Sequence, residues 1–531
     1  MNRVAAAVLI VVSATGAVFA QDAAPTAAAV APAYNLRADV ERVMKEFDVP
    51  GIAIAVVKDG KVVTAEGFGV RKRGEAAKVD GKTIFEIASN SKAFTAAALG
   101  MLVDQGKLSW DDPVIKHLPD FRMYDAYVTA EMTVRDLLTH RSGLGLGAGD
   151  LLWWPTTTFS TDEIIHNLRF VKPATSFRSA YAYDNLLYIV AGKIIAAKSG
   201  KTWGETMHEW ILKPVGMTGT TTSLEENAKF ANVSAPHSKI AGKAVPVKPM
   251  PVSNAVGAVG INTSAEDIAR WMNVLLDNGK VGADKRLWSD KQAREMWTAQ
   301  TPMTINTPRP PLAATKPNFY AYGLGFQLRD YQGKLVAMHG GALQGFYTRV
   351  LLVPEAKLGI AIFTNAESGP SLNALQYRLL DQHLGVAPTD WIGRIADIDK
   401  EMQAKEAARV KGEAASRAAQ SKPSLALASY EGDYEDAWYG KVSIKRVNNR
   451  LVMSFTRTPD LTGEMEHFQH DTFIVRWKER NFNADAYVTF SLDHDGSIER
   501  VRMKPVSTET DFSYDFQDLL LVPVKKEKAK S

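Results

Sequence analysis

The sequence predicts an α+β protein followed by a smaller all-β domain. Residues 51–69 contain two β-rich runs, strand-like runs return at 345–353 and 358–364, and helical patterns dominate the region between them. Strands at both ends of a region with helices between them are typical of an α+β fold. From residue 428 onward, short strands at regular spacing predict a small β-barrel or sandwich.

The first 33 residues predict export and a linker. MNRVAAAVLIVVSATGAVFA has one positive charge, an apolar run and a small-residue end, which indicates a secretory signal peptide at 1–20 that is cleaved after Ala20. A short membrane anchor is the alternative. The Ala/Pro-rich residues 21–33 are predicted to be a disordered linker. We therefore expect a periplasmic or secreted protein.

The larger domain is expected over residues 34–388. It opens with a helix predicted at 36–47, where apolar residues recur on one side. A hairpin follows, because Asp59-Gly60 between two β-rich runs is a strong two-residue turn signal. Helical patterns then occur at 91–105, 134–139, 184–198, 205–212 and 265–277.

The C-terminal third changes character twice. Residues 389–427 form a charged helical linker, and the Ala-rich pattern within it predicts an exposed helix that ends before Pro423. Strand-like runs then follow at short spacing within the β-domain predicted over 428–524. Residues 525–531 are expected to be a frayed tail.

The composition of the 531-residue chain excludes several functional classes. The 63 basic and 59 acidic residues give a net charge of +4, which argues against a dedicated nucleic-acid-binding protein. Without cysteine there are no disulfides, thiol nucleophiles or thiolate metal sites. His467 and His470 are expected to decorate a strand or loop, so no metal and no other cofactor is predicted. No later run of 18 apolar residues occurs, so no integral membrane segment is expected after signal cleavage.

The stretch IFEIASNSKAF carries the first candidate catalytic residues. Ser89 precedes Lys92 by three residues at the start of an Ala-rich helix, a spacing that places two side chains on one helix face about 5–6 Å apart. The helix N-terminus favours a developing negative charge, and a desolvated lysine can be neutral and accept the serine proton. The alternative is a serine that caps the helix and a solvated lysine.

Two later stretches point to the same chemistry. Tyr183-Asp184-Asn185 leads into an apolar helix, and His339-Gly340-Gly341 leads into a strand. With Ser89-x-x-Lys92, they resemble, in order, the three motifs of the serine β-lactamase and penicillin-recognising hydrolase family. The resemblance is to the peptidase S12-like branch that contains class C β-lactamases, DD-carboxypeptidases, D-aminopeptidases and esterases.

The resemblance covers about residues 36–386 and implies a fold. Further similar stretches lie at 133–144, 211–220 and 256–271. A β-lactamase/transpeptidase-like catalytic domain is therefore expected, with an antiparallel sheet flanked by helices and a helical subdomain. Residues 428–522 are similar to the lipocalin-like β-barrel appended to some of these hydrolases.

The resemblance also implies catalytic roles. Ser89 would be the acyl-forming nucleophile, and Lys92 would lower the cost of removing its proton. Tyr183 would act as general base and later as acid, with a nearby cation lowering its pKa from about 10. The backbone N–H groups of Ser89 and Ala342 would form the oxyanion hole.

Substrate-binding roles follow from the second and third motifs. Asn185 would hold the substrate amide and orient Lys92. His339 stands where many β-lactamases have lysine, and would supply a donor or a charge to the substrate. Gly340 and Gly341 would leave the strand edge free of side chains.

The motifs predict a serine hydrolase that works through an acyl-enzyme, without specifying its substrate. Small or unusual peptides are expected, with D-residues or of non-ribosomal origin such as linearised microcystin, because family peptidases often carry His-x-Gly. The alternatives are a carboxylesterase, a β-lactamase and a non-catalytic penicillin-binding sensor. The C-terminal barrel could bind an apolar ligand, shape the cleft or mediate association. His140 and Arg141 are interpreted as structural, and Trp153-Trp154 as structural or as a cleft wall.

Overall fold

The structure is a computed structural model that describes residues 33–418 and 420–525. The predicted signal peptide with its cleavage after Ala20, nearly all of the predicted linker and the end of the tail lie outside these residues. Within the described part of the chain, no helix combines the length and apolar character needed to cross a membrane.

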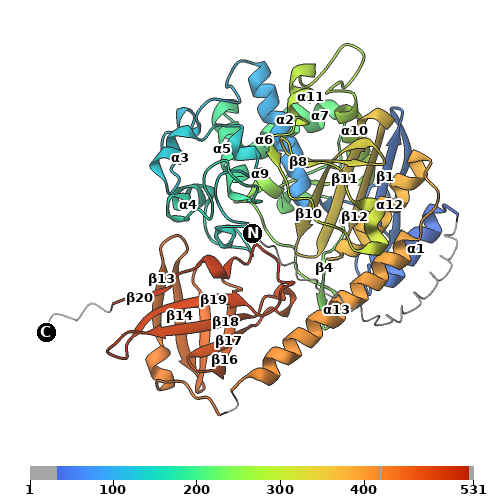
Figure 1. Cartoon of the computed structure of the whole chain (residues 1–531). Helices are drawn as coiled ribbons and strands as arrows, with labels where there is room; N and C mark the ends of the chain where they lie inside the picture. Colours follow the sequence, from blue (N-terminus) through green and yellow to red (C-terminus); the bar gives the residue numbers. More distant parts are fainter. Residues whose placement is uncertain (1–32, 419, 526–531) are drawn as a thin grey trace, which may run out of the picture.

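An eight-stranded antiparallel sheet forms the centre of the larger domain (Figure 1). The strand order is β2-β1-β12-β11-β10-β9-β8-β7. The strands span β1 Gly51–Lys58, β2 Lys61–Gly69, β7 Thr301–Pro302, β8 Tyr320–Tyr322, β9 Gln327–Tyr331, β10 Lys334–Leu343, β11 Phe346–Val353 and β12 Leu358–Thr364. Because β1 pairs with β12, strands from the two ends of this region meet, which confirms the predicted α+β class.

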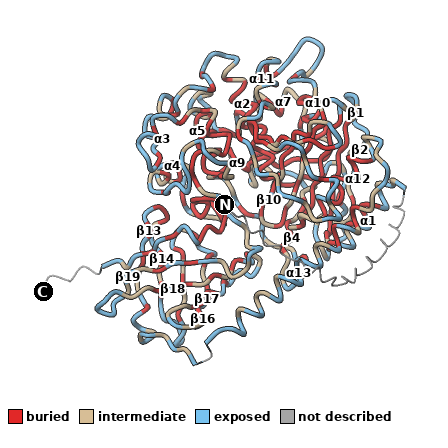
Figure 2. Tube along the Cα trace, in the orientation of Figure 1, coloured by how far each residue is buried: buried red, intermediate tan, exposed pale blue. Residues whose placement is uncertain are grey.

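Both faces of the sheet are covered by helices, and Figure 2 shows buried residues gathered in these layers. Alternate residues of β1 point to opposite faces. Ile52 and Ile54 pack in the core with α1 (Leu36–Phe47) and α12 (Gly369–Leu384), whereas Ala53 belongs to the core on the opposite face. The helix predicted at 36–47 has the bounds of α1.

The helical subdomain lies on one side of the sheet and carries the site (Figure 1). Its two apolar helices are buried on most of their surface, and correspond to the predictions at 91–105 and 184–198. Where a helix was predicted at 134–139, the structure has only a 3₁₀ turn, Asp136–Leu138. The helices between β2 and β7 are α2 Ser91–Asp104, α3 Ala126–Glu131, α4 Thr161–Asn167, α5 Leu186–Ser199, α6 Trp203–Met207, α7 Lys213–Val215, α8 Leu224–Asn227, α9 Val256–Val259, α10 Ala265–Leu276 and α11 Asp290–Met296. Of these, α10 packs against β1, β2 and β12 of the sheet.

A long helix, α13 (Trp391–Ser416), leads to the C-terminal domain (Figure 1). It ends at Ser416, before Pro423, as the sequence predicted. Its first turns are not exposed as predicted, because Trp391 and Ile395 are buried against the larger domain. From residue 397 to its end the helix has no buried residue and is the connection that the composition predicted.

The C-terminal domain is an eight-stranded antiparallel barrel. Its strand order is β19-β18-β17-β16-β15-β14-β13-β20, and a bridge between Val501 and Leu521 nearly closes it. Alternating residues such as Val442 and Ile444 are buried inside. The strands are β13 Gly432–Asp436, β14 Gly440–Val447, β15 Arg450–Phe455, β16 Thr462–Gln469, β17 Thr472–Trp477, β18 Ala486–Leu492, β19 Ile498–Pro505 and β20 Val522–Pro523.

Candidate active site

Ser89 lies in a 3₁₀ turn (Ala88–Asn90) that runs directly into α2. The preceding residue, Ala88, has a left-handed φ of 50°, a conformation that costs free energy in a residue with a Cβ atom and is enriched at functional sites. Lys92 lies one turn further on, and its Nζ donates to Ser89 Oγ at 3.0 Å. The structure therefore brings the two predicted residues into direct contact.

Lys92 is fully buried, and this burial sets its charge. Burial lowers the pKa of Lys92 to about 7, although the nearby carboxylates of Asp150 and Asp184 act in the opposite direction. Around neutral pH a substantial fraction of this lysine is therefore an uncharged amine. That form can accept the proton of Ser89.

Asn185 connects Lys92 to a buried carboxyl group. Lys92 Nζ donates to Asn185 Oδ1 at 2.8 Å, and Asn185 Nδ2 donates to Asp150 Oδ2 at 2.8 Å. Asn185 precedes α5, but its side chain makes no capping hydrogen bond to that helix. The geometry thus supports its predicted role in orienting Lys92. Burial raises the pKa of Asp150 to about 7.

The structure places Tyr183 at the predicted position but not with the predicted pKa. Lys92 Nζ lies 4.9 Å from the centre of its ring, and the ring of His140 lies 4.3 Å away. Burial raises the pKa of Tyr183 well above its ordinary value, and the Ser89 hydroxyl offsets this only partly. The expectation that a cation lowers this pKa is wrong, because desolvation of the phenolate is the larger effect.

His339 lines the same cleft, but it does not carry the expected charge. Burial lowers its pKa to about 3, and the proximity of Lys92 acts in the same direction. Its Nδ1 lies 2.6 Å from the Gly340 carbonyl oxygen, which requires the proton on this nitrogen, so Nε2 accepts from the Tyr322 hydroxyl at 2.9 Å. The ring is neutral and both nitrogens are engaged.

The open edge of β10 faces the nucleophile. Pairing of β10 with β9 ends at Met338, and the following residues Gly340, Gly341 and Ala342 line the cleft with Ser89. This position is compatible with an oxyanion hole made by the Ser89 and Ala342 backbones, which stays a prediction. A Cβ atom on Gly341 would lie 2.1 Å from the Ile87 carbonyl oxygen, so this glycine lets the Ser89 turn approach the strand.

The cleft has a volume of about 350 Å³ and includes residues that sequence reasoning missed. Trp153 and Trp154 line it, as one of the two sequence interpretations proposed. Phe512 and Ser513 of the C-terminal domain also line it, and Ser513 Oγ donates to Asp150 Oδ2 at 2.8 Å. No local motif marks these two residues, because 363 positions separate Ser513 from Asp150.

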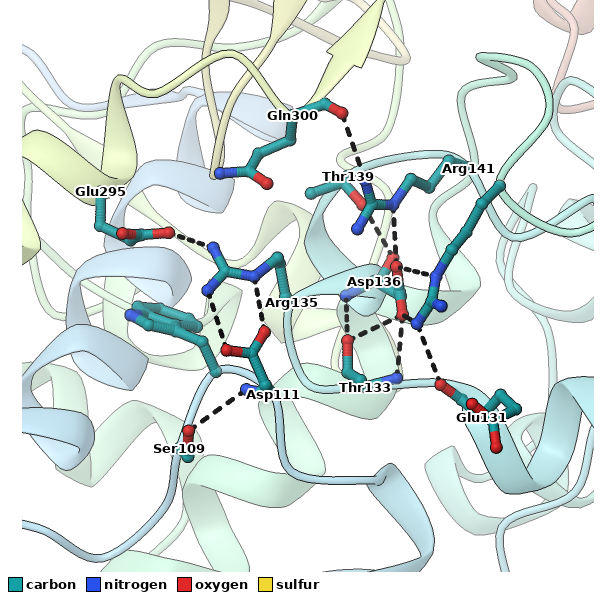
Figure 3. Close-up of polar contacts among 12 residues, drawn as sticks. Ser109, Asp111, Glu131, Thr133, Arg135, Asp136, Thr139, Arg141, Glu295 and Gln300 are labelled. Carbon is teal, nitrogen blue, oxygen red and sulfur yellow. Dashed lines mark hydrogen bonds and ion pairs between the residues drawn. The ribbon is translucent and has the colours of Figure 1, made fainter.

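The stretch that carries His140 is fixed by a buried ion-pair cluster (Figure 3). Asp136 lies at its centre, accepts from Arg141 Nε at 2.8 Å and also pairs with Arg178. These arginines hold the pKa of the Asp136 carboxyl below its ordinary value despite burial. Arg141 is thus structural, as expected. His140 accepts from the Asp184 backbone N–H at 3.1 Å and packs beside Tyr183.

Two family models match the chain. The model described as Beta-lactamase matches residues 36–384, which include every cleft residue that the larger domain supplies. A model described as a domain of unknown function (DUF3471) matches residues 416–523, the region of the barrel. The lipocalin-like character implied by the resemblance stays a prediction.

Individual proteins are similar over most of the chain. The unguisins hydrolase ungD' of Aspergillus campestris is 30% identical over 487 residues, covering 87% of each chain. The octameric penicillin-binding protein homologue from Pyrococcus abyssi shares the fold with a TM-score of 0.59 and 24% identity, over 92% of this chain and 99% of that one. A class C β-lactamase from Rhodobacter sphaeroides has a TM-score of 0.52 and 19% identity, over 66% of this chain and 99% of its own.

Proposed function

The chain belongs to the beta-lactamase family and is a serine hydrolase, and on that premise we propose that it cleaves short or unusual peptides through an acyl-enzyme on Ser89. Neutral Lys92 accepts the Ser89 proton while Oγ attacks the carbonyl carbon of the scissile bond. The backbone N–H groups of Ser89 and Ala342 stabilise the oxyanion of the tetrahedral intermediate.

Collapse of the intermediate needs a proton for the leaving amine. The Tyr183 phenol donates it, and the proton that Lys92 took from Ser89 then replaces the one that Tyr183 gave. The C–N bond breaks, the amine leaves and the acyl group stays on Ser89. Water attacks this ester, its proton passes to Ser89 Oγ and the carboxylic acid product is released.

The observation that favours a peptidase is the protonated phenol beside Ser89. Burial raises the pKa of Tyr183, so this residue holds its proton at neutral pH and can act as an acid. An amine is a poor leaving group until it is protonated, whereas an alkoxide or phenolate needs less help. A carboxylesterase that uses the same residues is the second candidate. A β-lactamase is less favoured, because the neutral His339 offers no positive charge to a substrate carboxylate.

A matched substrate panel tests this proposal. It contains a D-aminoacyl anilide, an acyl-D-Ala-D-Ala peptide, a longer linear peptide, p-nitrophenyl butyrate and a chromogenic cephalosporin, and is measured with wild type, Ser89→Ala and Tyr183→Phe. We expect Ser89→Ala to abolish all turnover without loss of the fold. Tyr183→Phe should reduce amide cleavage by about two to four orders of magnitude and ester cleavage much less.

Three outcomes would contradict the proposal in different places. Substantial activity of Ser89→Ala would exclude this nucleophile. Ester cleavage without amide cleavage would make the protein an esterase. An equal effect of Tyr183→Phe on esters and amides would remove the role of the phenol as the acid for the leaving amine. Circular dichroism of each variant serves as the folding control.

A further inference from the structure

A second cavity lies between the larger domain and the C-terminal barrel and adjoins the catalytic cleft. Its volume is about 580 Å³, compared with about 350 Å³ for the cleft. Trp154, Tyr347 and Asp511 line both cavities, so the two spaces are neighbours at these residues. The barrel domain supplies Asp511, and the larger domain supplies the other two.

One strand edge runs from the nucleophile into this second cavity. Gly340, Gly341 and Ala342 of β10 line the cleft, and the next residues, Leu343 and Gln344, line the cavity between the domains. Since β10 is not paired with β9 beyond Met338, an extended peptide can bind along this edge as an added strand. The edge leads past Ser89 for about three residues of peptide, at about 3.3 Å per residue.

The barrel domain places an exposed aromatic side chain in the catalytic cleft, next to Asp511, which lines both cavities. Phe512 lies edge-on to Tyr183, with ring centres 5.9 Å apart, yet 39% of its surface is exposed. Its neighbour Ser513 is buried and bonded to Asp150, which fixes the backbone on which Phe512 stands. An exposed ring held beside a catalytic group is favourable for a ligand side chain to cover.

The lining of the second cavity carries charges of both signs and fits a peptide chain: Lys239, Arg476 and Arg480 are basic, and Glu367, Asp485, Glu509 and Asp511 are acidic. Arg476 and Arg480 are both paired with Asp485, at 2.8 and 2.7 Å. The amides of Gln344 and Asn481 are available as donors and acceptors. Aromatic side chains supply apolar surface in the same space: Trp154, Tyr347, Phe482 and Tyr514.

We infer that the cavity between the domains is a substrate-binding subsite, built in part by the C-terminal barrel, that holds a stretch of peptide extending from the scissile bond. The inference rests on the proposed peptidase function and deepens it. It assigns the barrel a role in favouring peptides that extend about three residues from the scissile bond over peptides without this extension. The substrate class it predicts is a linear peptide with several residues on one side of the cleaved bond.

The test is a length series of peptides that share one scissile bond. Peptides are extended one residue at a time, on either side, and kcat/KM is divided by that of the same enzyme preparation for p-nitrophenyl acetate. With wild type we expect a rise of about tenfold or more over about three added residues on one side only, and a plateau thereafter.

Two variants should remove the gain with length. Phe512→Ala deletes the exposed ring, and Asn481→Trp fills the second cavity from the barrel side. Both should reduce the gain to within about threefold of no preference, whereas the control Val447→Trp, on an exposed site of the barrel, should keep it. Using two variants protects the test against one that fails to fold.

The outcomes separate this inference from the proposed function. Peptide cleavage without any gain from length, or a gain that survives in both variants, overturns the subsite and leaves the peptidase intact. Hydrolysis of p-nitrophenyl acetate with no cleavage of any peptide overturns both the proposed function and the subsite. A gain in wild type that is lost in Phe512→Ala and Asn481→Trp but kept in Val447→Trp supports the subsite.

Discussion

At the scale of single residues, the charge of Lys92 depends on a chain of hydrogen bonds that crosses from one domain to the other. Ser513 donates to Asp150, which accepts from Asn185, which in turn accepts from Lys92. The carboxylate end of this chain stabilises the ammonium form of Lys92, and burial opposes it. The protonation state of Lys92, the base for Ser89, is therefore coupled to the Ser513 side chain of the barrel domain.

The pH dependence of ester hydrolysis should report this coupling. Lys92 acts as a base only when neutral, so kcat/KM should rise with pH through its pKa, which burial lowers to about 7. The Ser513 hydrogen bond lowers the pKa of Asp150, so Ser513→Ala should leave Asp150 less ionised and Lys92 easier to deprotonate. In Ser513→Ala we therefore expect the rise of kcat/KM on the acid side of the pH profile to move to lower pH by about half a unit.

A pH profile from 5 to about 9 with p-nitrophenyl acetate measures this shift. Ser443→Ala, in strand β14, is the matched control and should follow wild type. A purely structural role of Ser513 would lower the rate at every pH without moving the limb. A limb that stays in place or moves to higher pH would contradict the coupling.

The sequence predicted the parts of the site that short motifs determine. Ser89 and Lys92 are three positions apart, and local helix geometry alone brings them together. Asp150 and Ser513 could not be found this way, because their contact depends on how two domains pack. The charge of His339 could not be predicted from the sequence either, because it depends on burial by residues distant in the chain.

At the scale of secondary-structure elements, the sequence predicted the bounds of those elements that local interactions determine. The first helix has the predicted bounds because Asn35 caps it and its apolar residues share one side. The connecting helix ends before Pro423 as predicted, but the exposure of its first turns was predicted wrongly. Burial of Trp391 against the larger domain instead makes its first turns part of that domain. The approach of the Ser89 turn to β10 is a contact between elements that no single pattern shows.

The two neighbouring glycines of β10 test that approach. A Cβ atom on Gly341 would lie 2.1 Å from the Ile87 carbonyl oxygen, whereas one on Gly340 would have Arg349 Nε as its nearest neighbour at 3.8 Å. Gly341→Ala must therefore displace the Ser89 turn, and we expect a loss of about 100-fold in kcat/KM together with a decrease of a few °C in Tm.

Gly340→Ala is the matched control for stability, and its Tm should stay within about 2 °C of wild type. Thermal unfolding followed by circular dichroism and ester hydrolysis give the two readouts. If Gly341→Ala had the stability and activity of wild type, the close contact between the turn and the strand would not be needed to position Ser89.

At the scale of the whole molecule, the two domains share buried polar contacts. Asp515 of the barrel domain accepts from the backbone N–H of Gly149 at 2.6 Å and of Leu151 at 3.2 Å. These residues flank Asp150, so one carboxyl group fixes the backbone of the segment that contacts Asn185. Arg457 of the barrel also donates to Thr158 at 2.9 Å. Because of these contacts, we expect the two domains to unfold together rather than independently.

Calorimetry of Asp515→Ala tests whether the domains unfold as one unit. The substitution leaves two buried N–H groups without their acceptor, at a cost of about 1–3 kcal/mol for each. Wild type should show one cooperative transition, and Asp515→Ala should show a lower Tm with the transition broadened or divided in two. Ester and peptide hydrolysis should fall together, because the Asp150 segment moves, in contrast to the effect on length preference expected for Phe512→Ala.

Asp460→Ala, in an exposed turn of the barrel, is the control and should match wild type. A single unshifted transition in Asp515→Ala would mean that the barrel is docked by its other contacts, and that Asp515 is not what couples it to the active site.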